Sequence, residues 1–242
     1  MHLQAIHLRA DQFPTNNRYP FNQAVLRETP VIEFVSPVTF FAGENGTGKT
    51  TLLEAICRKC GIHMWRSAER SRYEVNPHED QLYRYIEAEW VGGPVPGAFF
   101  GSDTFRHFTR SLDEWAAADP GMLDYFGGQS LVTKSHGQSM MAYFRSRYRI
   151  PGLYLLDEPE TALSPKNQLA LARLLVETGR AGRAQFIVAT HSPILLACPD
   201  ATILSFDSAP VETIAYQDTE TFVLYRRFME NPGSHMTLED PS

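Results

Sequence analysis

The stretch GENGTGKT, from Gly43 to Thr50, has the residue types and spacing of a loop that binds phosphate groups. Its glycines let backbone N–H groups turn inward, and the helix that follows adds the positive end of its dipole. Lys49 would place a positive charge on the β- and γ-phosphates of a nucleotide, and Thr50 would offer its hydroxyl to Mg²⁺. The predicted ATP contacts in and beside the loop are Gly43, Asn45, Gly46, Thr47, Gly48, Lys49, Thr50 and Thr51.

A second group of chemically useful residues ends the stretch LYLLDE, where an apolar run stops at Asp157 and Glu158. A strand that is apolar throughout is typical of the centre of a parallel sheet, so both carboxylates would lie at the carboxyl edge of that sheet. We expect Asp157 to hold Mg²⁺ and Glu158 to orient or deprotonate an attacking water. The alternative, two solvated acids that cap a turn, leaves the apolar strand unexplained.

Hydrophobic periodicity predicts the elements that position these residues. Short strands come first, the phosphate loop enters a helix, and strands and helices then alternate. Ser164 is the expected N-cap of one helix, with Gly179 past its end. Strands are expected at 3–8, 31–35, 38–43, 83–91, 97–100, 152–158, 184–190, 201–207 and 211–216, and helices at 49–60, 165–178, 191–198 and 220–230.

Composition narrows the class of protein. The 22 Lys and Arg residues against 28 Asp and Glu give a net charge of −6, which provides no overall attraction to nucleic acid or an anionic membrane. A local basic patch stays compatible with this charge. The start has no charged leader followed by an apolar run, and the apolar stretches are too short to cross a bilayer. We therefore expect a cytoplasmic protein without a membrane segment.

The three cysteines, Cys57, Cys60 and Cys198, are too few for a disulfide framework, which favours a reducing compartment. Cys57 and Cys60 stand close to His63, a pattern that also suggests zinc. No fourth ligand follows at a suitable spacing, and both cysteines end an apolar helical pattern. Packing is the preferred interpretation.

Ser135, His136, Gly137 and Gln138 stand directly before an apolar helical pattern. Here the chain resembles the ABC ATPase superfamily, whose signature reads Leu-Ser-Gly-Gly-Gln; Lys134 replaces the leucine and His136 the first glycine. The resemblance implies that the signature of one subunit binds the γ-phosphate held by the other, through the serine hydroxyl, glycine N–H groups and the start of the next helix. It thereby implies an ATP-dependent homodimer that encloses two ATP molecules.

Other landmarks of that superfamily follow in order. The stretch PETALS, residues 159–164, resembles the D-loop that crosses the dimer interface, with Ser164 in place of its aspartate. In ATHS, His191 takes the position of the switch histidine, which contacts the γ-phosphate and the attacking water; otherwise it would be a cap or surface residue. The Q-loop glutamine is absent, and Asp103 is the candidate for its magnesium and water position.

The resemblance covers roughly residues 21–193. It implies an α/β P-loop NTPase fold in one domain, 1–242: an ABC-type ATPase head with a mostly parallel central sheet, an N-terminal antiparallel β part and a small helical lobe at about 104–147. Tyr19 or Phe21 is the candidate that stacks on adenine, although either could belong to the core. The chain looks most like small stand-alone bacterial ATPases near the break-repair (SMC) and overcoming-lysogenization-defect branches.

Three functions are compatible with these features of the sequence. The first is an Mg²⁺-dependent ATPase whose ATP-driven dimer switches an unidentified partner protein or a nucleic-acid task. The second is the ATP-binding subunit of an ABC transporter, which would carry an apolar docking groove near the 104–134 lobe. The third is a small-molecule P-loop kinase, which would act as a monomer and would leave the signature and His191 without a role. The first is preferred because the sequence shows no transport-type Q-loop.

Overall fold

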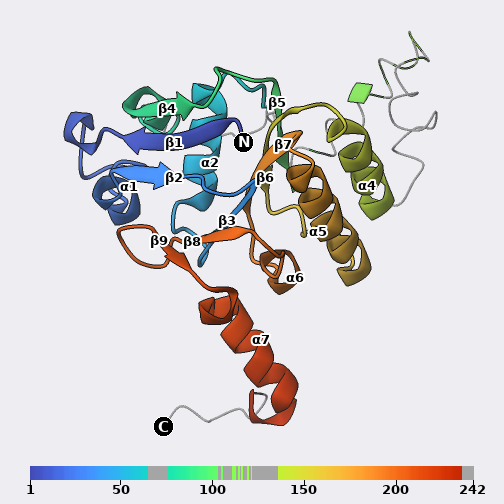
Figure 1. Ribbon diagram of the computed structural model, residues 1–242. Helices are drawn as coiled ribbons and strands as arrows, with labels where there is room; N and C mark the ends of the chain where they lie inside the picture. The colour runs from blue at the N-terminus through green and yellow to red at the C-terminus, as the bar shows by residue number, and fades with distance from the viewer. Residues whose placement is uncertain are drawn as a thin grey trace.

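The computed structural model describes residues 1–64, 76–102 and 136–235, together with positions 105, 111, 112, 114, 116, 119 and 121. Asp103 and Ser135, both predicted site residues, and most of the expected lobe at 104–147 lie outside this description. The described chain is an α/β structure with two sheets and helices on both faces of the larger one (Figure 1).

The larger sheet contains six strands in the order β5-β6-β7-β3-β8-β9. All neighbours are parallel except β9, which runs antiparallel to β8. The three middle strands are buried almost throughout because both faces of the sheet are covered, which explains their continuous apolar sequences. The bounds are β3 Val38–Ala42, β5 Gly97–Gly101, β6 Gly152–Asp157, β7 Ala184–Ala189, β8 Thr202–Ser205 and β9 Glu212–Ile214.

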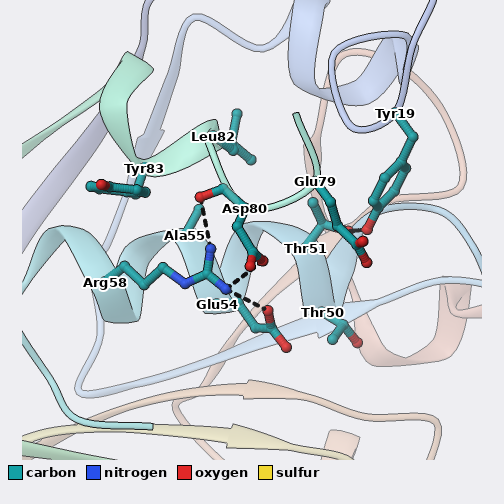
Figure 2. Close-up of a pocket in the computed structure, with 10 residues that line it drawn as sticks. All are labelled: Tyr19, Thr50, Thr51, Glu54, Ala55, Arg58, Glu79, Asp80, Leu82 and Tyr83. Carbon is teal, nitrogen blue, oxygen red and sulfur yellow. Dashed lines mark hydrogen bonds and ion pairs between the residues drawn. The ribbon is translucent and has the colours of Figure 1, made fainter. Parts of the chain in front are cut away.

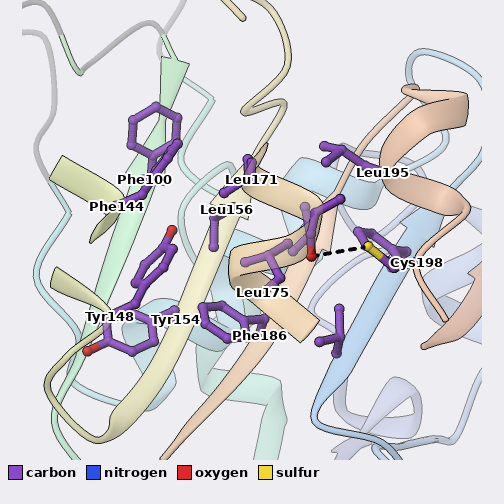
Figure 3. Packing of buried hydrophobic residues seen from close by; sticks show 14 of the residues in the cluster. Phe100, Phe144, Tyr148, Tyr154, Leu156, Leu171, Leu175, Phe186, Leu195 and Cys198 are labelled. Atoms are coloured by element: carbon purple, nitrogen blue, oxygen red, sulfur yellow. Dashed lines mark hydrogen bonds between the residues drawn. The ribbon is translucent and has the colours of Figure 1, made fainter. Parts of the chain in front are cut away.

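Side chains that alternate along the strands separate two hydrophobic cores. On one face, Tyr154 and Phe186 pack against helices α4 (His136–Arg147), α5 (Pro165–Arg180) and α6 (Pro193–Leu196), as Figure 3 shows. On the other face, Leu155 and Ile187 pack against α2 (Lys49–Lys59) and the smaller sheet. The helix that follows the phosphate loop and the helix that follows the predicted signature therefore lie on opposite faces.

The smaller sheet is antiparallel, in the order β2-β1-β4, and confirms the predicted N-terminal antiparallel part. Gln185, a buried polar residue of β7, joins it to the larger sheet: its Oε1 accepts from Leu3 N and its Nε2 donates to Leu3 O, both at 2.8 Å. The strands are β1 Leu3–Leu8, β2 Val31–Glu33 and β4 Ile86–Trp90, and the short helix α1, Ala24–Glu28, was not predicted.

Local signals placed the start of α5 correctly but not its end. Ser164 caps α5 as predicted, since its side chain accepts from Asn167 N, and Pro165 is the first helical residue. Gly179 was expected past the end of α5 but lies inside it, where it packs against Pro37. Gly182, with a φ of +69°, provides the left-handed turn after the helix instead.

The chain closes with α7, Glu220–Glu230, which extends away from both sheets in Figure 1. Short 3₁₀ turns complete the described elements, at Ala10–Gln12, Leu82–Tyr85, Tyr216–Asp218 and Pro232–His235. The strand expected at 83–91 therefore starts only at Ile86. None of the helices in the described part of the chain is long and apolar enough to span a bilayer.

Candidate nucleotide-binding site

The phosphate loop connects β3 to α2 and has the backbone that its glycines predict. Gly43, Gly46 and Gly48 have φ values of +140°, +83° and +103°, which side chains rarely adopt. At Gly48, a Cβ would also come within 2.9 Å of Gln23 Oε1. Gln23 holds the loop from outside, because its Nε2 donates to Gly46 O at 3.1 Å. The amino end of α2 is therefore open to an anion.

Asp207, which the sequence analysis missed, fixes the mouth of the loop. It follows β8, whose parallel neighbour β3 leads into the loop. Its Oδ1 accepts from Glu44 N at 2.7 Å, and its Oδ2 lies 3.3 Å from the Ser205 hydroxyl. A Cβ on Gly43 would lie 2.9 Å from the same Oδ1. The available signal was an aspartate directly after a buried strand.

Lys49 is buried and turned back onto the loop. Its Nζ donates to Gly43 O and Glu44 O, each at 2.7 Å. Burial lowers the pKa of this ammonium, and the nearby carboxylates of Glu158, Asp207 and Asp157 offset part of that effect. Two neutral carbonyls solvate a buried cation less well than an anion does. The loop is therefore prepared to exchange these contacts for phosphate oxygens.

Thr50 at the start of α2 meets Asp157 at the end of β6, although β6 is not a neighbour of β3, the strand that leads into the phosphate loop. The strand β7 lies between β3 and β6, and Ala189 is in register with both Phe41 and Asp157. The carboxylate therefore lies level with the end of the strand that leads into the loop. The Thr50 hydroxyl donates to Asp157 Oδ1 at 2.9 Å.

Burial raises the pKa of Asp157 to about 7; the hydrogen bond from Thr50 lowers it, and the charge on Glu158 raises it further. A hydroxyl beside a carboxylate matches the oxygen ligands that Mg²⁺ takes when it also binds nucleotide phosphates. A cation at this position would favour the ionised carboxylate. The two residues therefore fit the predicted Mg²⁺ site.

Glu158 and His191 come together at the next position along the edge. Glu158 has a φ of +44°, an uncommon conformation for a residue with a side chain, and its N donates to Ala189 O at 2.9 Å. This backbone aims the carboxylate so that its Oε1 lies 3.9 Å from His191 Nε2. Nε2 makes no hydrogen bond within the described residues. The pair can therefore approach a water or phosphate oxygen from one side.

Glu160 is a further residue that the sequence analysis missed. Its Oε1 accepts from His191 N at 2.7 Å, so it fixes the backbone of the histidine. Burial raises the pKa of this carboxyl, and hydrogen bonds from Thr190 and His191 lower it. Its sequence signal was weak, because an acid two residues after Glu158 resembles a solvated turn residue.

Two protein families match parts of the chain that contain this site. Residues 21–63, with the phosphate loop, match a family described as "AAA domain", and residues 141–197, with Asp157, Glu158 and His191, match "AAA domain, putative AbiEii toxin, Type IV TA system". The chain is a P-loop ATPase.

Known proteins resemble this ATPase over most of its length. The "Aliphatic sulfonates import ATP-binding protein SsuB" of Mycobacterium avium (strain 104) is 23% identical over 88% of this chain and 82% of its own. Among solved structures, cbiO1 from Clostridium perfringens, part of the ABC transporter complex cbiONQ, has a TM-score of 0.51 at 15% identity, covering 96% and 97% of the two chains. An SmcHead bound to the C-winged helix domain of ScpA has a TM-score of 0.51 at 14% identity, covering 89% and 98%. Both structural likenesses concern the fold.

The two residues considered for stacking on adenine have different environments in the structure. Phe21 is fully buried between Phe13 and Tyr85, so its prediction as a stacking residue is wrong and it belongs to the core. Tyr19 is exposed, and its OH lies 2.6 Å from the Thr51 hydroxyl. Figure 2 shows it at one end of a polar pocket beside α2.

The other predicted site residues of the ATPase are described only in part. Asn45 is exposed at the tip of the loop, and Thr47 Oγ1 donates to Glu44 O at 2.9 Å. Gly137 and Gln138 lie in the first turn of α4, which begins at His136, and the side chain of His136 lies outside the described part. Cys57, once considered for zinc, is buried and donates to Ile62 O, and burial raises the pKa of its thiol.

Proposed function

We propose that this ATPase encloses Mg-ATP between two copies of itself, and that the ATP-bound pair acts as a switch for a partner protein or a nucleic-acid task. The observation that carries the proposal is the place of α4 relative to the phosphate loop. The amino end of α4 can serve a γ-phosphate only if that phosphate belongs to another copy.

The direction of α4 follows from its contacts. Its last residue, Arg147, lies near the starts of β5 and β6: its Nη2 donates to Gly97 O at 3.2 Å, and its carbonyl accepts from the Tyr154 hydroxyl at 2.8 Å. The helix therefore runs opposite to the strands, and its amino end points toward the carboxyl edge, where the phosphate loop also opens.

The two features are nevertheless separated within one chain. Helix α4 packs over β5 and β6, as the 4.8 Å between the Phe100 and Phe144 rings shows, and lies on the face opposite to α2. From β6 to β3 there are two strand spacings, about 10 Å, before the thickness of the helix layer is added. A phosphate in the loop is beyond hydrogen-bond reach of the amino end of α4, but a two-fold copy could bring the two together.

Gly137 supports a shared interface at this edge. A Cβ there would lie 3.1 Å from Asn167 Nδ2 and 3.2 Å from Ala162 O, so a side chain would require these neighbours to shift by a few tenths of an ångström. Gly137 of the predicted signature therefore lies against Ala162 of the predicted D-loop. A face-to-face dimer needs the two segments to lie together in this way.

The site residues then have distinct roles. Lys49 releases the loop carbonyls and binds phosphate oxygens, while Thr50 and Asp157 would hold Mg²⁺, which neutralises phosphate charge when bound. Glu158 accepts a proton from the attacking water, and His191 orients that water or the γ-phosphate. The amino end of the second copy's α4 provides N–H groups for the transferred phosphate. We place this activity in the cytoplasm, where ATP and reduced thiols occur together.

The decisive test compares the solution mass of the Glu158→Gln protein with and without Mg-ATP. The carboxamide can no longer accept the proton, so ATP should persist and the ATP-dependent dimer should accumulate. Glu230→Gln, on the exposed surface of α7, is the matched control and should hydrolyse ATP normally. Ser135→Arg, in the Glu158→Gln background, should bind nucleotide without the increase in mass. An ATP-bound protein whose mass does not change would refute the dimer.

One observation favours a second function, the ATP-binding subunit of a transporter. SsuB, matched over most of both chains, is named as an import ATP-binding protein. The docking groove expected near 104–134 falls largely outside the described residues. If this function holds, the protein should co-purify with a membrane fraction from its own host. It should stay in that fraction whether or not ATP is added.

A further inference from the structure

Gln168, in the first turn of α5, connects two loops that belong to the nucleotide site. Its Nε2 donates to Leu163 O at 3.0 Å, and its Oε1 accepts from the Ser192 hydroxyl at 2.7 Å. Leu163 belongs to the predicted D-loop, and Ser192 directly follows His191. None of the roles described above involves this side chain.

The two hydrogen bonds need a group that both donates and accepts. Leu163 O is an acceptor, so the atom of Gln168 that faces it must donate. The Ser192 hydroxyl already accepts from Leu195 N at 3.1 Å, where it caps α6, so its own hydrogen is directed to Gln168. The side-chain amide of glutamine meets both demands at once.

This bridge is one side of a closed ring of hydrogen bonds. Glu160 Oε1 accepts from His191 N at 2.7 Å, and Glu160 O accepts from Leu163 N at 2.8 Å. From Leu163 O the ring continues through Gln168 to Ser192, the residue next to His191. The backbone of His191 is therefore held on both sides: Glu160 binds its own N–H, and Gln168 binds the residue that follows.

The ring lies where the strands no longer fix the chain. Strand β7 ends at Ala189, and Thr190 N still donates to a carbonyl of the chain that leads out of β3, at 3.2 Å. After Thr190, the direction of the His191 side chain depends on contacts with α5 and the 159–164 segment. Helices α5 and α6 lie side by side on one face of the sheet (Figure 1), and Ser192 is buried where they meet. Water therefore competes little for the hydrogen bond that Ser192 donates.

We propose that Gln168 is a positioning residue for ATP hydrolysis, which couples the 159–164 segment to the orientation of His191. It acts by fixing the backbone that aims the imidazole, not by contact with the nucleotide. The inference rests on the role proposed above for His191. Because the 159–164 segment faces the second copy in the proposed dimer, the same bridge would link assembly of the dimer to the position of the histidine.

The first experiment compares steady-state ATP hydrolysis by the full-length parent and Gln168→Met. Methionine has the length of glutamine but makes neither hydrogen bond, so kcat should fall by about tenfold while KM stays within about twofold. Arg173→Met, at an exposed residue further along α5, is the matched control and should hydrolyse ATP like the parent. A Gln168→Met protein with the parental kcat, or one whose loss is entirely in KM, would overturn the proposal.

A double-mutant cycle tests whether the two sides of the ring act on the same histidine. Glu160→Ala and Gln168→Met each release the backbone of His191, so the double variant should lose little more kcat than the weaker single variant. Two independent residues would instead give the product of the single losses, roughly a hundredfold. A product of this size, in variants that keep the parental circular dichroism spectrum, would show that Gln168 does not act through His191.

The third experiment separates this inference from the proposed dimer. With Mg-ATP, Gln168→Met should still form the dimer, and the dimer should persist longer than that of the parent because ATP is hydrolysed more slowly. Solution mass followed over time measures this. A variant that loses the dimer together with kcat, while Glu158→Gln still dimerises, would show that Gln168 acts on the interface and would overturn the positioning role.

The two proposals can therefore fail independently. If Glu158→Gln and Gln168→Met both stay monomeric with ATP but Gln168→Met still loses kcat, the dimer is refuted and the positioning of His191 stands. If both proteins dimerise and Gln168→Met keeps the parental kcat, the positioning role is refuted alone.

Discussion

The phosphate loop and α7 differ in how firmly the rest of the protein holds their residues. The loop is held without a ligand by hydrogen bonds from Gln23 to Gly46 O, from Glu44 N to Asp207 and from Lys49 to Gly43 O. In α7, Leu224, Tyr225 and Met229 are 56%, 52% and 75% exposed. A site that must position phosphate groups is preorganised by buried contacts, because misplaced donors lose most of their value.

The largest expected effect concerns Lys49. In Lys49→Ala the loop lacks its buried cation, and ATP affinity should fall by about a hundredfold, as expected when charge-assisted bonds worth about 3 kcal/mol are lost. Titration calorimetry measures this directly. Lys59→Ala, at an exposed residue near the end of the same helix, should bind ATP normally. Equal affinities for the two variants would show that the cation is not part of the site.

The next effect separates the fixing of His191 from nucleotide binding. Glu160→Ala removes the acceptor for the His191 N–H, so the histidine should lose its position and kcat should fall by roughly tenfold, the cost of about one buried hydrogen bond. The ATP affinity should stay unchanged. Glu160→Gln keeps an acceptor oxygen and should restore most of the rate. If both variants lose ATP affinity to the same extent, Glu160 acts through the fold instead.

A smaller effect tests the preorganisation of the loop. Asp207→Ala frees the Glu44 N–H and should weaken ATP binding about fivefold to tenfold, in line with the loss of one hydrogen bond to a charged group. Asp200→Ala is a control at an exposed aspartate that pairs only with Arg180 among the described residues. The comparison with α7 would fail if Asp207→Ala bound ATP as tightly as the control.

The pH dependence of stability tests the burial of Asp157. The folded pKa of about 7 lies above the unfolded value near 3.8, so this group stabilises the fold at low pH, and the contribution disappears as pH rises through 7. Without Mg²⁺ and nucleotide, Asp157→Asn should therefore be more stable than the parent at about pH 8 and differ less at about pH 5. Urea unfolding at both pH values measures this, and a difference that does not change with pH would contradict it.

The smallest effect is expected at α7. Leu224→Ala should change the Tm of the dilute, monomeric protein by no more than about a degree, because an exposed side chain gives up little burial. Its ATP affinity should equal that of the parent. Scanning calorimetry at low concentration provides the measurement. A large loss of stability would mean that α7 is part of the folded core, and the contrast between the two regions would disappear.

The sequence determined those parts of the site whose chemistry is local. The glycines of the phosphate loop, the acids that end a buried strand and the serine cap of α5 were recognisable because neighbours in the chain define them. The alternation of strands and helices was predictable for the same reason, since hydrophobic periodicity reports which faces are covered. The antiparallel N-terminal part was expected from the resemblance to the ABC ATPase superfamily.

Only the tertiary structure decided which distant residues meet. It placed β7 between β3 and β6, brought Asp207 to the phosphate loop, and directed Glu160 to the backbone of His191. It also buried Phe21 and exposed Tyr19, two aromatic residues that the sequence could not rank. The physical reason is that strand order and side-chain burial depend on packing between segments far apart in the chain, whereas caps and turns depend on a few neighbouring residues.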